Sequence, residues 1–155
     1  MTTLHRVDLY AAPWDLVWLL HANHACLPLL LGLGVDFDGR SSGAFRPGHG
    51  GTVVIPGRRS PLYGYRVIEL DAALHVVETL ETRWPARHWR RRHVVIGQGD
   101  STRVEETVTL EGPIAPFLDP SRSARWSERR ARALTAWLAR APEDRPPLPA
   151  NARAP

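Results

Sequence analysis

The sequence predicts an α+β domain in which a curved antiparallel sheet wraps around a long C-terminal helix, with two short helices near the N-terminus. The elements come in the order strand, two short helices, several strands, long helix. Short separators rich in Gly and Pro favour consecutive hairpins between the strands. The last helix is amphipathic, and the concave face of the sheet is the surface large enough to cover its apolar stripe. We therefore expect a hollow between sheet and helix.

The N-terminal part begins with one strand and continues with two short helices. Thr3–Ala11 alternates between outward and inward positions, which is typical of a half-buried strand. Pro13 then opens a helix, because proline is tolerated at the first helical position. Ala25–Leu33 predicts a second short helix, with Pro28 in its first turn and two glycines that end it.

The stretch from Val35 to Glu111 consists of strand patterns joined by turn residues. Asp38-Gly39 is a dipeptide typical of tight turns. Gly48–Gly51 (GHGG) lacks the spacing of a phosphate-binding loop, so we expect a hairpin turn or a kink in the curved sheet. The candidate strands are Val35–Phe37, Gly43–Phe45, Thr52–Ile55, Leu62–Leu70, Leu74–Trp84, His88–Ile96 and Arg103–Glu111.

The C-terminal part predicts one long helix and a tail. Asp119 can cap the helix, Pro120 occupies its first position, and Pro142 ends it. Pro142–Pro155 is rich in proline and poor in large apolar residues, so we expect a disordered tail after a single domain of residues 1–141. The apolar stripe of the helix consists of Ser127, Ala131, Leu134, Leu138 and Ala141.

Length and composition exclude several classes of protein. The 155 residues fit one globular domain, and the one cysteine, Cys26, rules out a disulfide framework and a cysteine-based zinc site. Met1–Tyr10 lacks the apolar stretch of a signal peptide, and polar residues interrupt Trp14–Leu33, so no membrane span is expected. We expect a cytoplasmic protein with no membrane partner.

Two basic segments, Arg87–His93 and Arg122–Arg132, raise the alternative of nucleic-acid binding. All 20 Lys+Arg residues are arginine, and the formal net charge is +4. On a strand, however, Trp89 faces the opposite side from Arg90 and Arg92. The alternation leaves no continuous basic stripe, and we expect no nucleic-acid partner.

Four segments resemble the START-like helix-grip superfamily (SRPBCC), in particular its polyketide cyclase/dehydrase branch. They are Val7–Trp18 (VDLYAAPWDLVW), Tyr65–Asp71 (YRVIELD), Ser101–Val108 (STRVEETV) and Gly112–Leu118 (GPIAPFL). The resemblance covers residues 3–141. It implies a helix-grip fold with a deep apolar cavity that holds a hydrophobic or aromatic small molecule.

One local pattern of the resemblance is sharper. Related sequences often carry an aromatic-x-His-x-His-x-Phe run, a turn, and then a Thr-Arg-x-x-Asp strand. Two positions depart from it, because Arg91 replaces the first histidine and Glu106 replaces the aspartate. The matching positions are Trp89, Arg91, His93 and Val95, followed by Thr102, Arg103 and Glu106.

The spacing of this hairpin places His93 beside Glu106. If Val95 pairs with Val104, antiparallel register puts His93 directly opposite Glu106, with Cβ atoms about 5 Å apart. A register slip of one residue would instead pair Arg92 with Glu106 and turn His93 outward.

The face that carries His93 and Glu106 is the more apolar one, so we expect it to be concave. A carboxylate buried there needs a partner, and histidine can carry protons near neutral pH. We predict His93 as the acid/base, Glu106 as its orienting partner and Arg91 as a donor to a ligand oxygen. The alternative is an ion pair of the hairpin with no chemical role.

Further residues are predicted to bind the ligand. Trp18 and Trp89 are candidate walls for a flat molecule. His21 and His24 lack a nearby acidic partner, so we expect them to rim the cavity and expect no metal site. The predicted ligand-binding residues are Trp89, Trp18, Tyr65, His24, Glu78 and Arg130.

Two functions remain open at this point. The first is a cofactor-independent cyclase or aromatase-dehydratase of bacterial secondary metabolism, which needs a shaped cavity, a base and donors for an enolate. Its partner is a hydrophobic or aromatic small molecule, with an acyl carrier protein as a further candidate. The second is a carrier or sensor of an apolar ligand, which would leave few ionisable groups in the hollow.

Overall fold

The computed structural model describes residues 2–31, 36–37, 43–54, 63–83, 87–111, 120–150 and 152. Within these residues, seven antiparallel strands form one sheet in the order β1-β7-β6-β5-β4-β3-β2. The strands are β1 (Thr2–Tyr10), β2 (Asp36–Phe37), β3 (Gly50–Val54), β4 (Tyr63–Asp71), β5 (Val76–Arg83), β6 (Arg87–Gln98) and β7 (Ser101–Glu111).

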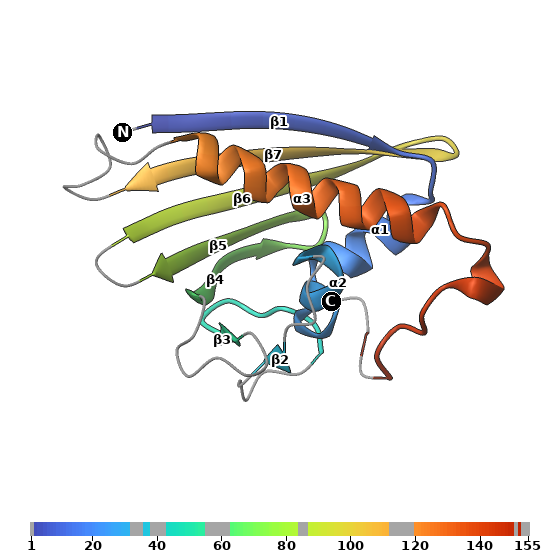
Figure 1. Ribbon diagram of the computed structural model, residues 1–155, viewed down its shortest axis with the longest axis horizontal. Helices are drawn as coiled ribbons and strands as arrows, with labels where there is room; N and C mark the ends of the chain where they lie inside the picture. The colour runs from blue at the N-terminus through green and yellow to red at the C-terminus, as the bar shows by residue number, and fades with distance from the viewer. Residues whose placement is uncertain are drawn as a thin grey trace.

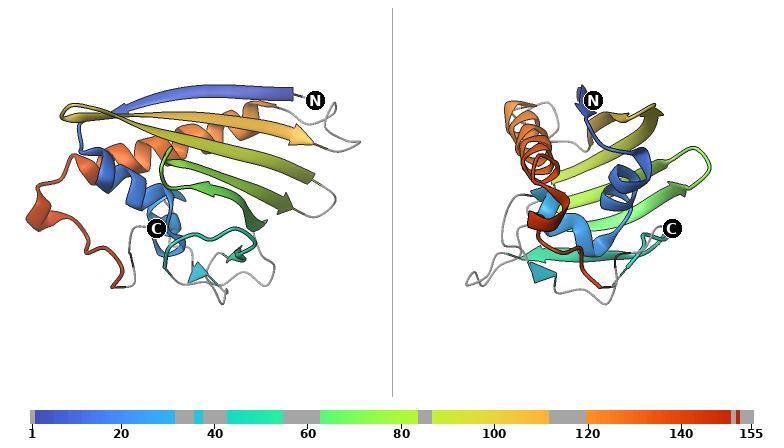
Figure 2. Two further views of the ribbon diagram at one scale, coloured as in Figure 1. Left: turned by 180° about the vertical axis from the view of Figure 1, so that it is seen from behind. Right: turned by 90° about the vertical axis from the view of Figure 1, so that its right-hand side faces the viewer.

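The helices lie on the concave side and at one end of this curved sheet (Figure 1). They are α1 (Trp14–His21), the 3-10 helix η1 (His24–Cys26), α2 (Leu27–Leu31), α3 (Pro120–Leu138) and the 3-10 helix η3 (Pro142–Asp144). Seen from behind and from the side, the sheet curves around α3, which contacts β1 and α2 (Figure 2). The α+β fold predicted from the order of elements is confirmed.

The hairpin of β6 and β7 has the register that the sequence predicts. Val95 pairs with Val104 and His93 pairs with Glu106, so the slip toward Arg92 does not occur. Along β7 every second side chain is buried, as expected for a strand with one face toward a core.

The segment around Ala44 corrects one predicted strand. Gly43–Phe45 forms an isolated bridge between Ala44 and Asn23 rather than a strand of the sheet. The Phe45 amide donates to the Ala22 carbonyl at 2.8 Å, because this segment pairs with the connection after α1.

The predicted N-terminal helices differ from the structure at their ends. Pro13 precedes α1 as its N-cap. The second helix is split into η1 and α2, because the Asn23 side chain accepts from the Ala25 amide at 2.9 Å and starts a separate turn. The predicted glycine stops Gly32 and Gly34, and the turn at Asp38-Gly39, lie outside the described residues.

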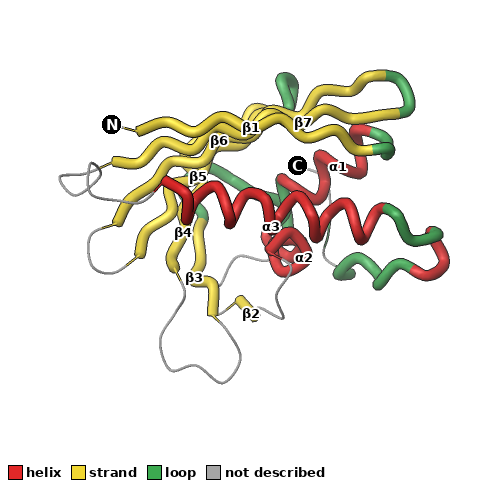
Figure 3. The backbone as a smooth tube through the Cα atoms, turned by 45° about the horizontal axis from the view of Figure 1, so that its top comes forward, coloured by secondary structure: helices red, strands yellow, loops and turns green. Residues whose placement is uncertain are grey.

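The helix α3 lies across the concave side of the sheet (Figure 3), and its apolar stripe is buried as predicted. Ser127, Ala131, Leu134 and Leu138 are buried, and only Ala141, beyond the end of the helix, is exposed. Among the described residues, no helix is both long enough and apolar enough to cross a membrane.

The glycines of the GHGG segment serve the sheet and its turn. Gly48 has a φ of +85°, which suits glycine in a turn. A Cβ on Gly50 would lie 2.2 Å from the Tyr65 carbonyl oxygen, so β3 and β4 approach too closely for a side chain there. These positions are structural, in line with the predicted turn or kink.

The described part of the tail contacts the domain. Arg145 Nη2 donates to the Leu138 carbonyl at 2.9 Å, and its guanidinium lies 5.1 Å from the ring centroid of Trp137. Leu148 packs against the core. Arg145 thereby satisfies a carbonyl that the end of α3 leaves without a helical partner.

Candidate functional site

Charged side chains from three adjacent strands meet on the concave face beneath α3. Arg91 on β6 lies between Glu81 on β5 and Glu106 on β7. Its Nε donates to Glu81 Oε1 at 3.0 Å, and its Nη1 donates to Glu106 Oε1 and, at 3.1 Å, to Ser127 Oγ. These three charged residues are buried, so their opposite charges must compensate one another. Together with His93 and Arg130 they form what we call the buried cluster.

His93 is the second partner of Glu106. Its Nε2 lies 3.3 Å from Glu106 Oε1. Burial raises the pKa of Glu106, but Arg91 and His93 outweigh burial and hold this pKa well below its usual value. Burial lowers the pKa of His93 and outweighs the opposing effect of Glu106. The pair is therefore a carboxylate and a neutral imidazole, with hydrogen on Nε2 and a lone pair on Nδ1.

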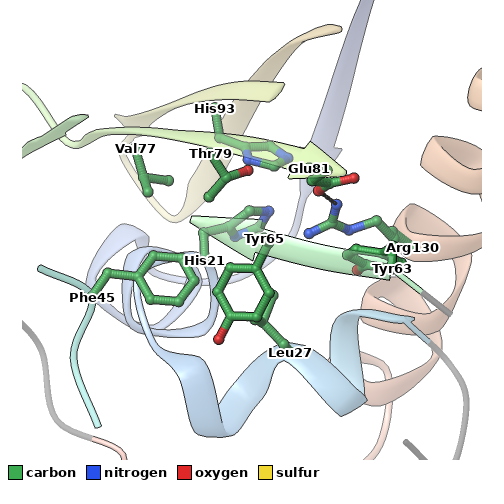
Figure 4. Close-up of a pocket in the computed structure, with 10 residues that line it drawn as sticks. All are labelled: His21, Leu27, Phe45, Tyr63, Tyr65, Val77, Thr79, Glu81, His93 and Arg130. Atoms are coloured by element: carbon green, nitrogen blue, oxygen red, sulfur yellow. Dashed lines mark ion pairs between the residues drawn. The ribbon is translucent and has the colours of Figure 1, made fainter. Parts of the chain in front are cut away.

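Glu81 is held from the sheet and from α3. Trp89 Nε1 donates to its Oε2, and Arg91 Nε donates to its Oε1. Arg130 of α3 lies at a longer distance, with Nη1 3.5 Å from the same Oε1 (Figure 4). Burial raises the pKa of Glu81, but the two arginines and Trp89 bring it below its usual value. The two glutamates and two arginines of the cluster thus carry balanced charges.

A second neutral imidazole lies next to His93. His21, at the end of α1, donates from Nδ1 to the Val17 carbonyl at 2.8 Å when its neutral form carries the hydrogen there. The ring centroids of His21 and His93 are 5.0 Å apart. Burial, and then His93, lower the pKa of His21 to about 3. Among the described residues no hydrogen bond to its Nε2 is found, so this lone pair is available too.

Two small pockets lie beside these histidines, with cavity volumes of about 10 and 20 Å³. Each has room for roughly one water molecule. His21, His93 and Arg130 line both pockets. The first is further lined by Phe45, Tyr63 and Tyr65 (Figure 4), and the second by Tyr10, Glu106 and Ser127. At these two positions the side chains of the described residues leave only small spaces.

The structure brings the three predicted catalytic residues together, but it changes the position of one of them. His93 and Glu106 face a pocket, whereas Arg91 lines neither. Its Nε and Nη1 donate to Glu81, Glu106 and Ser127, and its role as a donor to a ligand oxygen stays a prediction. Arg130 is the arginine that faces the pockets.

Two of the predicted ligand-binding residues, Tyr65 and Arg130, line a pocket. Trp18 does not, because its ring packs against His75 with centroids 5.6 Å apart. Trp89 does not either, although it faces inward, because it is hydrogen-bonded to Glu81. Neither tryptophan lines these two pockets, and their role as walls of a ligand site stays a prediction.

Glu78 lines neither of these two pockets. It is buried, but it points to the convex face, where its Oε1 lies 3.3 Å from Nη1 of the exposed Arg90. Glu81, three residues along β5, is the glutamate that reaches the hollow.

His24 reaches the first pocket through Tyr65. Its Nδ1 is hydrogen-bonded to the Tyr65 hydroxyl, and its ring packs edge-on against Phe45 with centroids 4.4 Å apart. Burial lowers the pKa of His24 to about 4. The histidine is therefore neutral and positions Tyr65, although it does not line the pocket itself.

Sequence reasoning missed Glu81 and Tyr63 and placed His21 only at the rim. Tyr63 and Tyr65 alternate on β4, and Thr79 and Glu81 alternate on β5, so the period of two was a usable signal. Among the described residues, no group of three or more His, Cys, Asp or Glu side chains is placed to hold a metal ion.

Solved structures with the same arrangement of elements define the class of this fold. Ginseng major latex-like protein 151 from Panax ginseng has a TM-score of 0.70 at 12% identity, with 90% of this chain and 98% of that chain covered. Norcoclaurine synthase from Thalictrum flavum, in complex with dopamine and hydroxybenzaldehyde, has a TM-score of 0.58 at 16% identity, with 87% of each chain covered. The chain has the fold of the START-like helix-grip superfamily.

A third similar structure extends the comparison. The di-domain ARO/CYC protein BexL from the BE-7585A biosynthetic pathway has a TM-score of 0.66 at 18% identity. The match covers 88% of this chain and 46% of that one. No protein-family model matches the sequence, and no curated protein sequence matches it. At these identities the similarity defines the fold.

Proposed function

We propose that the protein binds a hydrophobic or aromatic small molecule between the sheet and α3 and catalyses proton transfer on it without a cofactor. The reaction class is that of a polyketide-type cyclase or aromatase-dehydratase of bacterial secondary metabolism. The observation that carries the proposal is the buried His93–Glu106 pair, which shares a pocket wall with the neutral His21. A carrier of apolar ligands would need none of these buried ionisable groups, each of which is costly to bury.

The pair has the arrangement of a general base with an orienting carboxylate. The lone pair on His93 Nδ1 would remove the acidic proton next to a ketone, and Glu106 would stabilise the imidazolium that results. A hydrogen-bond donor that faces the same pocket would stabilise the enolate oxygen. The enolate carbon would then form a bond to a second carbonyl carbon of the same molecule, and the new alkoxide would take the proton from His93.

Loss of water would complete an aromatase-type reaction. His93 would remove the remaining α-proton from carbon. It would then donate this proton to the departing hydroxyl group, which leaves as water. The similarity to BexL supports this reaction class. The dopamine and hydroxybenzaldehyde bound in the norcoclaurine synthase complex support an aromatic ligand.

A ligand at these two pockets would require their side chains to move, since each pocket holds roughly one water molecule. The side chains between the two pockets are His21, His93 and Arg130. Movement of the Arg130 side chain, which lines both pockets, would enlarge the space for the ligand.

The test uses 2-tetralone, an aromatic ketone with exchangeable α-protons, in D₂O. We expect the protein to accelerate α-deuteration, and His93→Gln to lose about 100-fold of this rate, which is typical of removing a general base. Glutamine keeps a donor for Glu106, so binding of the ketone, followed by quenching of protein fluorescence, should persist. His88→Gln, on the exposed face of the same strand, is the matched control.

Equal deuteration rates in the wild type and His93→Gln would contradict the proposal. Binding without any deuteration would favour the carrier. Because 2-tetralone is free in solution, the test is independent of the acyl carrier protein that we propose as a further partner.

A further inference from the structure

The two arginines of the buried cluster are bound very differently. Arg91 donates hydrogen bonds to two glutamates and a serine. Arg130 has one ion pair among the described residues, at 3.5 Å to a Glu81 oxygen that already accepts from Arg91 Nε at 3.0 Å. A guanidinium carries five N–H donors, and among the described residues most of those of Arg130 have no protein acceptor.

Arg130 is nevertheless almost fully enclosed, since its side chain is 11% exposed. It lines both pockets, and the close-up places its guanidinium beside Glu81 at the same pocket as His21 and His93 (Figure 4). A mostly buried cation with few hydrogen-bond partners is stabilised by an acceptor that binds beside it.

Glu81 does not depend on Arg130. If Arg130 turned toward a ligand, Glu81 would keep Arg91 on one oxygen and Trp89 on the other. No buried carboxylate would therefore be left without a partner. Arg130 is the member of the cluster that can change partners.

We propose that Arg130 binds the carboxylate of an aromatic acid whose ring lies against Tyr63, Tyr65 and Phe45. This deepens the proposed function by naming the substrate class, and it rests on that function for the site's location. A planar guanidinium matches a carboxylate with two parallel hydrogen bonds. Asp8 and Glu106 line the second pocket, so a singly charged carboxylate suits the site better than a doubly charged phosphate.

The test compares two probes of the same shape, 2-naphthoate and its neutral analogue 2-naphthamide. We expect the wild type to bind the carboxylate at least about tenfold more tightly, the effect of one charge-assisted contact. In Arg130→Gln the two affinities should become equal within about twofold. Arg132→Gln, an exposed arginine of the same helix paired only with Glu128 among the described residues, should keep the preference.

Three results would overturn the proposal: no preference in the wild type, an unchanged preference in Arg130→Gln, or no binding of either probe at millimolar concentration. If Arg130→Gln does not fold, Arg130→Lys serves instead, because lysine keeps the charge but cannot donate two parallel hydrogen bonds from a planar group. The preference should then fall severalfold, and an unchanged preference would overturn the proposal. Neither probe has an α-proton to exchange, so this outcome is separate from the deuteration test of His93.

Discussion

Neighbouring arginines on the two faces of β6 have the same kind of partner in opposite surroundings. Arg90, on the convex face, lies 2.9 Å from Glu111 and is 48% exposed at its side chain. Arg91, on the concave face, binds Glu81 and Glu106 and is 3% exposed. Exposed pairs contribute little, because water screens them, whereas a buried pair that loses a partner leaves a costly charge. An arginine–glutamate ion pair is therefore expected to matter little for stability on the convex face and to be required on the concave face.

The largest effect expected from this comparison is on the free energy of unfolding of Arg91→Ala. We expect a loss of about 3–5 kcal/mol, because two buried glutamates lose their main partner. Arg90→Ala, the matched control one residue away, should lose less than about 1 kcal/mol. Urea unfolding measures both, and equal losses would show that burial does not distinguish the two faces.

A smaller effect is expected in the pH dependence of stability. Burial lowers the pKa of His21 to about 3 and that of His24 to about 4, below the value of an unfolded histidine. The contribution of each neutral histidine to the free energy of unfolding is complete above the pKa of an unfolded histidine, near 6.5. It is lost as the pH falls below that value, because the unfolded state then binds a proton that the folded state does not. The depressed pKa of Glu106 acts in the same direction at lower pH.

Between pH 7 and pH 5 the stability should therefore fall, by roughly 1–2 kcal/mol for each buried histidine. His24→Gln cannot take up the proton and should show a shallower fall. His88→Gln, which changes an exposed side chain, should follow the wild type. A wild-type stability that is flat or rises toward pH 5 would contradict the buried, neutral histidines.

The hairpin of β6 and β7 explains why part of the site could be predicted from the sequence. The turn between these strands is short, so the pairing of Val95 with Val104 fixes every other pair, including His93 with Glu106. Alternation then decides which face each residue occupies. Arg91, His93 and Glu106 were found by this reasoning.

The pairing of β5 could not be predicted in the same way. Both of its faces mix apolar and polar residues, and Val76 and Val77 are both buried, so alternation alone does not choose between Glu78 and Glu81. In addition, the register of the β4–β5 pairing shifts between Val67 and Glu69, so one known pair does not determine the others. The position of Trp18 depends on how α1 packs, which no local pattern encodes.

The central claim is that His93 is a neutral base whose Nε2 hydrogen faces Glu106 and whose Nδ1 lone pair is available. Long-range ¹H–¹⁵N NMR of the imidazole at pH 7 tests it most directly, with His93→Gln identifying the signal. The account predicts a neutral ring protonated at Nε2, because burial lowers the pKa of His93 while Glu106 stays ionised beside it. An imidazolium, or a neutral ring protonated at Nδ1, would contradict it.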